Sequence, residues 1–220
     1  KQPMRLSKSH IIAYTISWVI IVLLAIKLWQ HYSPQPIENV RAKISVAKQQ
    51  PLDIVFGNDS ANLSVYMYAS YNCSYCRKFF TEVLPELQSF IEQNQIKIIM
   101  RLTSKSKDDR LKRALKAAVC VNHYGNFEHL HKLLLHDPKV AYTSDFQNMI
   151  DEFSMKDPFV GACIDGEIAA QHLEKNLKEF NQLQLKGTPS FVINNIVYQG
   201  YREPKIFKRI TEKHLSNLNQ

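Results

Sequence analysis

Two cysteines three positions apart stand where a buried strand meets an amphipathic helix, and this junction constrains the fold more than any other feature. The strand is predicted over Leu63 to Ala69, and apolar residues recur at helical spacing from Cys73 to Gln93. At the first turn of a helix, unpaired backbone N–H groups and the helix dipole favour a thiolate. We therefore expect Cys73 to be the reactive sulfur and Cys76 its deeper partner, within reach of a disulfide.

The same cysteine spacing also occurs in inert structural disulfides and in zinc sites. Zinc needs further ligands, and the sequence has no second C-x-x-C pair. Histidines cluster at His123, His129, His131 and His136, but residues 129 and 131 point to different sides of a helix. We therefore predict no metal site and no cofactor, and an inert disulfide stays an alternative.

The surrounding periodicity predicts an α/β domain. Strands are expected at Leu52 to Phe56, Ile96 to Leu102, Ser190 to Asn194 and Ile196 to Tyr198. Helical segments are expected at Leu111 to Asn122, Phe127 to His136, Ser144 to Phe153, Asp157 to Ile164, Glu167 to Leu183 and Pro204 to Leu215. Pro85 predicts a kink in the helix that begins at the cysteines. The layout is a β-α-β half and a β-β-α half with helices inserted between them.

The N-terminal segment reads as a membrane anchor. Ile11 to Ile26 is free of charge, and with Leu28 and Trp29 the run approaches the length that crosses a bilayer. We predict a cytoplasmic N-terminus at 1–10, an uncleaved transmembrane signal-anchor at 11–30, a linker at 31–50 and the main domain at 51–220. A cleaved signal peptide is the alternative.

The linker carries a short apolar pattern of its own. Ile37, Val40, Ile44 and Ala47 recur at helical spacing, which predicts an amphipathic stalk. Such a stalk either lies on the domain or pairs two copies of the chain, so a homodimer is possible.

Charge argues against a nucleic-acid partner. The formal net charge is +8, from 28 Lys and Arg against 20 Asp and Glu, and half of the excess lies at Lys1, Arg5, Lys8 and Lys27. The remaining positive charge is scattered and is not interleaved with aromatic residues, so we expect no binding to nucleic acid.

A second motif supports the cysteine pair. Gly187-Thr188-Pro189 directly precedes a predicted strand, where a cis Thr-Pro bond would expose the backbone of Thr188. Together the two motifs resemble the DsbA-like family of the thioredoxin superfamily. The matching residues are Gly57-Asn58 with Ala61, Tyr71 to Cys76, Ala117 to Cys120, Phe127 with His131, Phe159 to Asp165 and Gly187 to Asn194.

The resemblance implies a thioredoxin fold with a helical insertion at about 105–185. It also implies a nucleophilic Cys73, a resolving Cys76 and a cis Pro189 packed against them. Thr188 would then bind an extended substrate segment through its backbone. We include Tyr75, between the cysteines, among the candidate substrate contacts.

The function implied is that of a thiol–disulfide oxidoreductase that forms, isomerises or reduces disulfides in exported cysteine-containing proteins. It would lie in the periplasm, held to a bacterial inner membrane by a single span, and would exchange electrons with a membrane or periplasmic redox partner. The alternative is a thioredoxin-fold chaperone or copper-binding module without redox turnover. Nearby Met or His ligands would favour copper, and Met67 is the only candidate close in sequence.

The sequence departs from the family pattern at two places beside the cysteines. Ser74-Tyr75 replaces the Pro-His or Pro-Tyr that oxidising members usually carry, so we expect a less extreme oxidant. Ser70 stands where the family often has an acidic residue.

Cys120 and Cys163 form a second, distant pair inside the predicted helical insertion. Some family members carry a structural disulfide there, and such a bond would be worth roughly 4 kcal/mol in the chain-entropy model. Two free buried thiols are the alternative.

Overall fold

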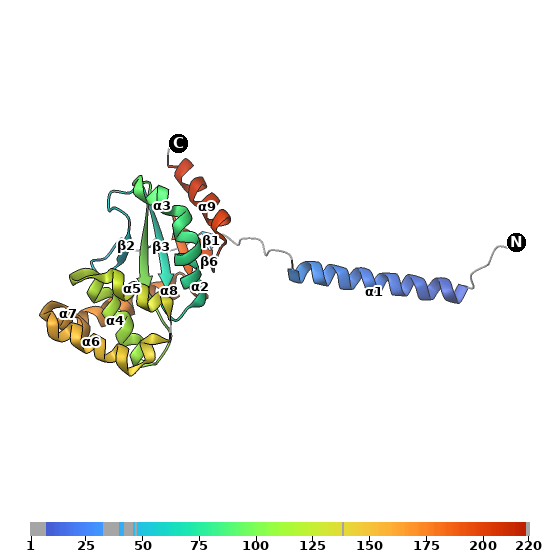
Figure 1. Ribbon diagram of the computed structural model, residues 1–220. Helices are drawn as coiled ribbons and strands as arrows, with labels where there is room; N and C mark the ends of the chain where they lie inside the picture. Colours follow the sequence, from blue (N-terminus) through green and yellow to red (C-terminus); the bar gives the residue numbers. More distant parts are fainter. Residues whose placement is uncertain (1–7, 33–39, 42–45, 47, 138, 219–220) are drawn as a thin grey trace. The chain divides into compact units, whose positions relative to one another are not determined.

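The computed structural model describes residues 8–32, 40–41, 46, 48–137 and 139–218, which belong to two units, Lys1–Glu38 and Asn39–Gln220 (Figure 1). The first unit contains helix α1 (Lys8–Tyr32). Within the described ranges, no helix combines the length and apolarity needed to cross a membrane. The membrane-spanning segment at 11–30 is thus not confirmed and stays a prediction.

A mixed sheet forms the centre of the second unit. Its strands are β1 (Val40–Arg41), β2 (Ile54–Phe56), β3 (Leu63–Ala69), β4 (Ile96–Leu102), β5 (Ser190–Ile193) and β6 (Ile196–Gln199). Their spatial order is β1-β6-β5-β3-β4-β2. The β3 and β4 strands are parallel, and the other neighbours are antiparallel. The predicted β-α-β and β-β-α halves are therefore confirmed.

The predicted stalk falls mostly on residues outside the described ranges. Where it is described, the helical prediction is wrong, because Val40–Arg41 is the strand β1 and pairs with Val197 and Ile196 of β6. Alternating apolar and polar residues in so short a segment also fit an edge strand, and the open edge of β6 offers its hydrogen bonds there. Nothing in the described residues bears on self-association of the chain.

Helices cover both faces of the sheet, and alternation along the central strands separates the two layers. On β3, Val65 and Met67 belong to the main core with Phe79 and Phe207, whereas Tyr68 packs on the opposite face with Phe180. The first layer consists of α2 (Ser74–Lys78), α3 (Leu84–Glu92) and α9 (Pro204–Ser216). The α8 helix (Glu167–Gln182) contributes to the second.

The helix predicted from Cys73 to Gln93 is interrupted just before Pro85, the residue at which the sequence predicts a kink. A π-helical turn at Phe79–Val83 separates α2 from α3, and Pro85 lies in the first turn of α3. Proline has no N–H for the carbonyl four residues earlier, so the widened turn accommodates its ring.

The two C-terminal strands meet in a tight hairpin. Asn194 and Asn195 both have positive φ, 48° and 62°, which suits the right-handed twist of a two-residue turn. The predicted Asn-Asn turn is confirmed.

A helical layer lies between β4 and β5 in the sequence and gathers beside the sheet (Figure 1). It contains α4 (Asp109–Tyr124), α5 (Phe127–His136), the 3-10 turn Val140–Tyr142, α6 (Ser144–Lys156), α7 (Pro158–Asp165) and α8. Side-chain caps begin most of these helices. Asp157, for example, accepts hydrogen bonds from the backbone N–H groups of Phe159 and Val160 at 2.9 and 3.3 Å.

A buried ion cluster ties α8 to the sheet. Arg101 of β4 is fully buried and donates to both carboxylate oxygens of Asp53, at 3.1 to 3.3 Å, and to Glu179 of α8. Its guanidinium also lies 4.7 Å from the centre of the Tyr66 ring. Because the charge is paired and hydrogen-bonded, it is tolerated in the interior.

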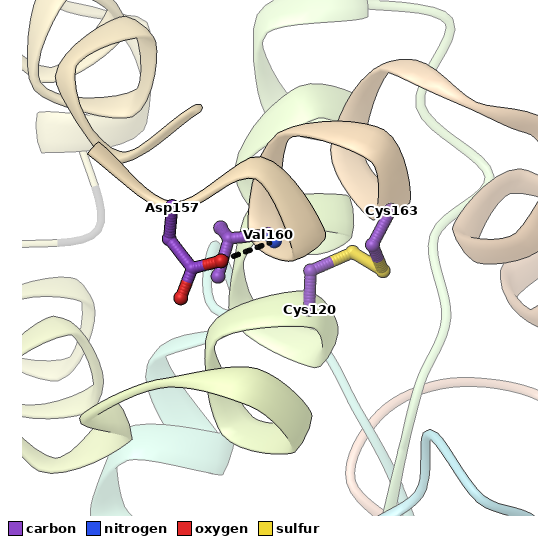
Figure 2. Close-up of a disulfide and its surroundings, with 4 residues drawn as sticks. All are labelled: Cys120, Asp157, Val160 and Cys163. Carbon is purple, nitrogen blue, oxygen red and sulfur yellow. Dashed lines mark hydrogen bonds between the residues drawn. A yellow bond between two sulfur atoms is a disulfide. The ribbon is translucent and has the colours of Figure 1, made fainter. Parts of the chain in front are cut away.

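Cys120 of α4 and Cys163 of α7 are joined by a disulfide (Figure 2). Their Cα atoms are 5.8 Å apart, and both residues are at most 2% exposed. Figure 2 also shows the Asp157 cap at the start of α7, so both the beginning and the end of this short helix are held in place. The bond therefore cross-links two helices of the insertion.

Replacing Cys120 and Cys163 together by alanine removes this cross-link. We expect the free energy of unfolding to fall by about 4 kcal/mol, because the bond closes a loop of 43 residues and so restricts the unfolded chain. Urea denaturation of both proteins measures the difference, which should largely vanish in excess reductant. An equal midpoint for the two oxidised proteins would contradict this role.

Candidate active site

Cys73 sits at the N-terminus of α2 because the connection from β3 is short and tightly bonded. Its backbone N–H donates to the carbonyl of Ser70, at 3.1 Å, directly after the end of β3. Cys73 is the N-cap of α2, with extended backbone (φ −98°, ψ 113°), and its sulfur accepts from the N–H of Cys76 at 3.3 Å. The sulfur thus takes the place that an N-cap oxygen usually has.

The two thiols are unbonded and differ in exposure and acidity. Cys73 is half-buried, whereas Cys76 is only 2% exposed. Hydrogen bonding from the Cys76 side chain is the main cause that lowers the pKa of Cys73 to about 6, and N–H groups of Cys76 and Tyr75 add to it. Burial, followed by the hydrogen bond to Cys73, raises the pKa of Cys76 far above its usual value.

The Thr188-Pro189 motif, 115 positions after Cys73 in the sequence, lies beside the Cys73 sulfur. The peptide bond between them is cis, and the carbonyl oxygen of Thr188 lies 3.1 Å from the Cys73 sulfur. The loop is fixed on both sides, because Ser190 Oγ donates to the carbonyl of Gly187 and the N–H of Gly200 donates to that of Pro189. The two motifs singled out in the sequence are therefore in contact.

Tyr75 is an exposed side chain beside the cysteines. It is 55% exposed, and its ring centre lies 5.8 Å from that of Tyr201. The Tyr201 hydroxyl donates to Glu82 at 2.5 Å, and the ammonium of Lys78 lies 5.7 Å from the centre of its ring. Sequence reasoning missed Tyr201, whose only signal is an aromatic residue directly after Gly200.

His131 supports the turn before Cys73. Its Nδ1 is 2.8 Å from the hydroxyl of Tyr71, and its ring packs against Phe56, Phe80 and Phe127. Burial lowers the pKa of His131 to about 4, so the ring is neutral at physiological pH. The other three histidines of the cluster are exposed, and the described residues hold no group of three or more His, Cys, Asp or Glu suited to a metal ion.

Comparison with known proteins identifies the family to which this chain belongs. The family model described as Thioredoxin matches residues 49–213. A Rickettsia felis protein with the provisional name protein-disulfide oxidoreductase is 26% identical over 159 residues, covering 68% of this chain and 55% of the relative. The corresponding Rickettsia prowazekii protein is 24% identical, over 72% of this chain and 60% of the relative. The chain thus spans a little over half the length of these two relatives.

Solved structures share the fold at low identity. BdbD of Bacillus subtilis in its oxidised form has a TM-score of 0.61 and 19% identity, covering 81% of this chain and 98% of BdbD. The α-DsbA1 protein of Wolbachia pipientis has a TM-score of 0.58 and 21% identity, over 77% and 94% of the two chains. The resemblance inferred from the sequence is confirmed. The chain belongs to the thioredoxin family, and its fold is that of DsbA-like members.

Proposed function

We propose that the chain is a thiol–disulfide oxidoreductase acting on exported cysteine-containing proteins through Cys73 and Cys76. The observation that carries the proposal is that the pKa values of two neighbouring thiols, Cys73 and Cys76, are shifted in opposite directions. One is a half-exposed thiol with a lowered pKa beside the Thr188 carbonyl, and the other is a buried thiol with a raised pKa. A low pKa makes the outer sulfur an effective nucleophile and leaving group near neutral pH.

Reduction of a substrate disulfide needs two exchanges. The Cys73 thiolate attacks one substrate sulfur, forming a mixed disulfide, and the second substrate sulfur leaves as a thiolate that takes up a proton. Cys76 then loses its proton and attacks Cys73, which forms the Cys73–Cys76 disulfide and releases the first substrate sulfur. Oxidation of a substrate dithiol is the same sequence reversed, and a dithiol or disulfide partner restores the starting state.

The acidity of Cys76 fits its part in the second exchange. Its raised pKa has burial as the first cause, and the hydrogen bond to Cys73 and the charge of Cys73 follow. Formation of the mixed disulfide removes the negative charge of Cys73. The last two causes then disappear, and Cys76 becomes easier to deprotonate when it must attack.

The surroundings offer a place for the substrate chain. Thr188 and Pro189 form the edge next to the Cys73 sulfur, where an extended segment would pair with the backbone, as in β-strand addition. Tyr75 and Tyr201 present aromatic surface on the α2 side. We assign substrate contacts to Thr188, Pro189 and Tyr75, and we add Tyr201.

We further propose that the domain lies in the periplasm and is held to a bacterial inner membrane by residues 11–30. The support is the uncharged run Ile11 to Ile26, which is apolar on every side of a helix and follows Arg5 and Lys8. A helix of this kind needs an apolar environment along its whole length.

Membrane attachment is tested with lysines placed inside the run. Val19→Lys together with Leu23→Lys should shift the full chain from carbonate-washed membranes to the supernatant, because charges near the bilayer centre are costly. The control is Gln171→Lys with Gln182→Lys, which adds the same charge to exposed positions of α8. Wild-type protein found in the supernatant would overturn the anchor.

The acidity of Cys73 is tested by its rate of alkylation as a function of pH. In the reduced protein the rate at Cys73, followed by mass spectrometry, should rise with a midpoint near pH 6. An ordinary thiol has its midpoint about 2.5 pH units higher, near 8.5. Cys76→Ser keeps a hydrogen-bond donor and should change the midpoint little, whereas Cys76→Ala should raise it. A wild-type midpoint above 8, or equal midpoints for the two variants, would contradict this origin of the acidity.

Turnover is tested by insulin reduction and by refolding of a scrambled disulfide protein. Cys73→Ser should lower the rate at least about 100-fold, since it removes the nucleophile. Cys76→Ser should instead accumulate the mixed disulfide with substrate, visible on a non-reducing gel. Full activity of Cys73→Ser with an unchanged circular dichroism spectrum would reject the enzymatic proposal.

A further inference from the structure

A polar pocket of about 250 Å³ opens beside the redox pair. Ser70 and Thr188 belong to its lining, and both also contact Cys73 through their carbonyl oxygens. The lining also includes the loop after β4 and Phe180 of α8. A group bound here would therefore lie next to a molecule that is reacting with Cys73.

The lining carries positive charge and no carboxylate. Its charged residues are Lys105 and Lys186, and the rest are hydroxyl, amide, glycine and phenylalanine positions. The ammonium of Lys105 lies 5.4 Å from the centre of the Phe180 ring, which holds it at the pocket. Among the residues that the structure describes, neither lysine forms an ion pair with a carboxylate.

One residue of the lining, Thr103, has a buried hydroxyl without a hydrogen-bond partner among the described residues. Thr103 is 3% exposed, and its Oγ1 is a buried polar atom without a hydrogen bond within the described part of the chain. Its backbone N–H donates to the carbonyl of Ala69 at 2.9 Å, so the residue is fixed to the end of β3. Burying an unsatisfied hydroxyl is unfavourable, and such a group in a native structure calls for a ligand or a solvent partner.

We propose that this pocket binds a carboxylate side chain on the substrate polypeptide, close to the cysteine that exchanges with Cys73. The proposal rests on the proposed function and names the substrate class of that site. Two lysines and an orphaned hydroxyl match the charge and the acceptor oxygens of Asp or Glu. Carboxylate is the common anionic group of polypeptides, and the uncharged Ser70 keeps a competing negative charge out of the lining.

The test follows a single exchange, so it needs no redox partner. Cys76→Ser protein reacts with peptides whose cysteine is joined to 5-thio-2-nitrobenzoate by a disulfide. Cys73 attacks the peptide sulfur, one S–S bond forms as the other breaks, and the coloured nitrobenzoate thiolate leaves with the electron pair. Paired peptides differ only by Glu or Gln, at each position within three residues of the cysteine.

At one or more positions we expect the Glu peptide to react about three- to fivefold faster than its Gln partner, as for one favourable partly exposed charge pair. The preference should decline at 0.5 M salt. It should also be lost in Lys105→Gln with Lys186→Gln, and reduced in Thr103→Val, which keeps the shape of the side chain. Lys156→Gln, which removes a charge from exposed surface of α6, should keep it.

Failure of the two proposals gives different results. If no peptide reacts with Cys73, the proposed function itself fails. If Glu and Gln peptides react equally at every position, or the Lys156 control loses the preference as well, the pocket assignment is overturned while the exchange chemistry stands. A lysine-dependent preference for glutathione disulfide over its carboxyl esters, with none for any peptide, would assign the pocket to a small thiol and overturn the polypeptide assignment.

Discussion

The pairing of β3 with β5 is the constraint on which the active site depends. Tyr68 lies opposite Ser190, so the end of β3 and the start of β5 meet at the same end of the sheet. At that end of the sheet, the segment after β3 continues through Ser70 to Cys73, and the segment before β5 contains Thr188 and Pro189. A shift of one residue would turn every side chain of β5 to the opposite face. The alternation of side chains between the two cores fixes the register of β3 and β5. It therefore also fixes the contact between the Cys73 sulfur and Thr188.

The opposite pKa shifts of the two active-site cysteines come from hydrogen bonds at Cys73 and from burial at Cys76, without a nearby cation. Within the part of the chain that the structure describes, the causes of the lowered pKa of Cys73 are hydrogen bonds from the side chains of Cys76 and Thr188 and from the backbone N–H groups of Cys76 and Tyr75, and no Lys, Arg or His is among them. His131 is kept neutral by burial among aromatic rings, and it hydrogen-bonds to Tyr71 rather than to Cys73. The Cys73 thiolate is stabilised by hydrogen-bond donors that the fold holds in place. Cys76 stays protonated because burial raises its pKa.

Features with a local or periodic signal could be predicted from the sequence, and those made by distant contacts could not. The cysteine pair, Thr188-Pro189 and the Asn194-Asn195 turn each have a short-range signal. Arg101 stands in a strand of apolar residues, and its partners Asp53 and Glu179 come from 48 and 78 positions away. Likewise, the contact of Tyr75 with Tyr201 and the pocket at Thr103 exist only after the sheet has brought separate loops together.

The helical insertion connects stability with the surroundings of the site. The loop after β4 supplies Thr103 and Lys105 to the pocket and leads directly into α4, and α8 supplies Phe180. The disulfide holds α4 to α7, and Glu179 holds α8 to Arg101 in the sheet. The helix that follows this loop and the helix that carries Phe180 are thus each held by a buried bond. Binding to a mobile loop costs the conformational entropy of ordering that loop. Because the helices beside the pocket are already held, recognition of a substrate carboxylate by the lysines is more favourable than it would be on a mobile loop.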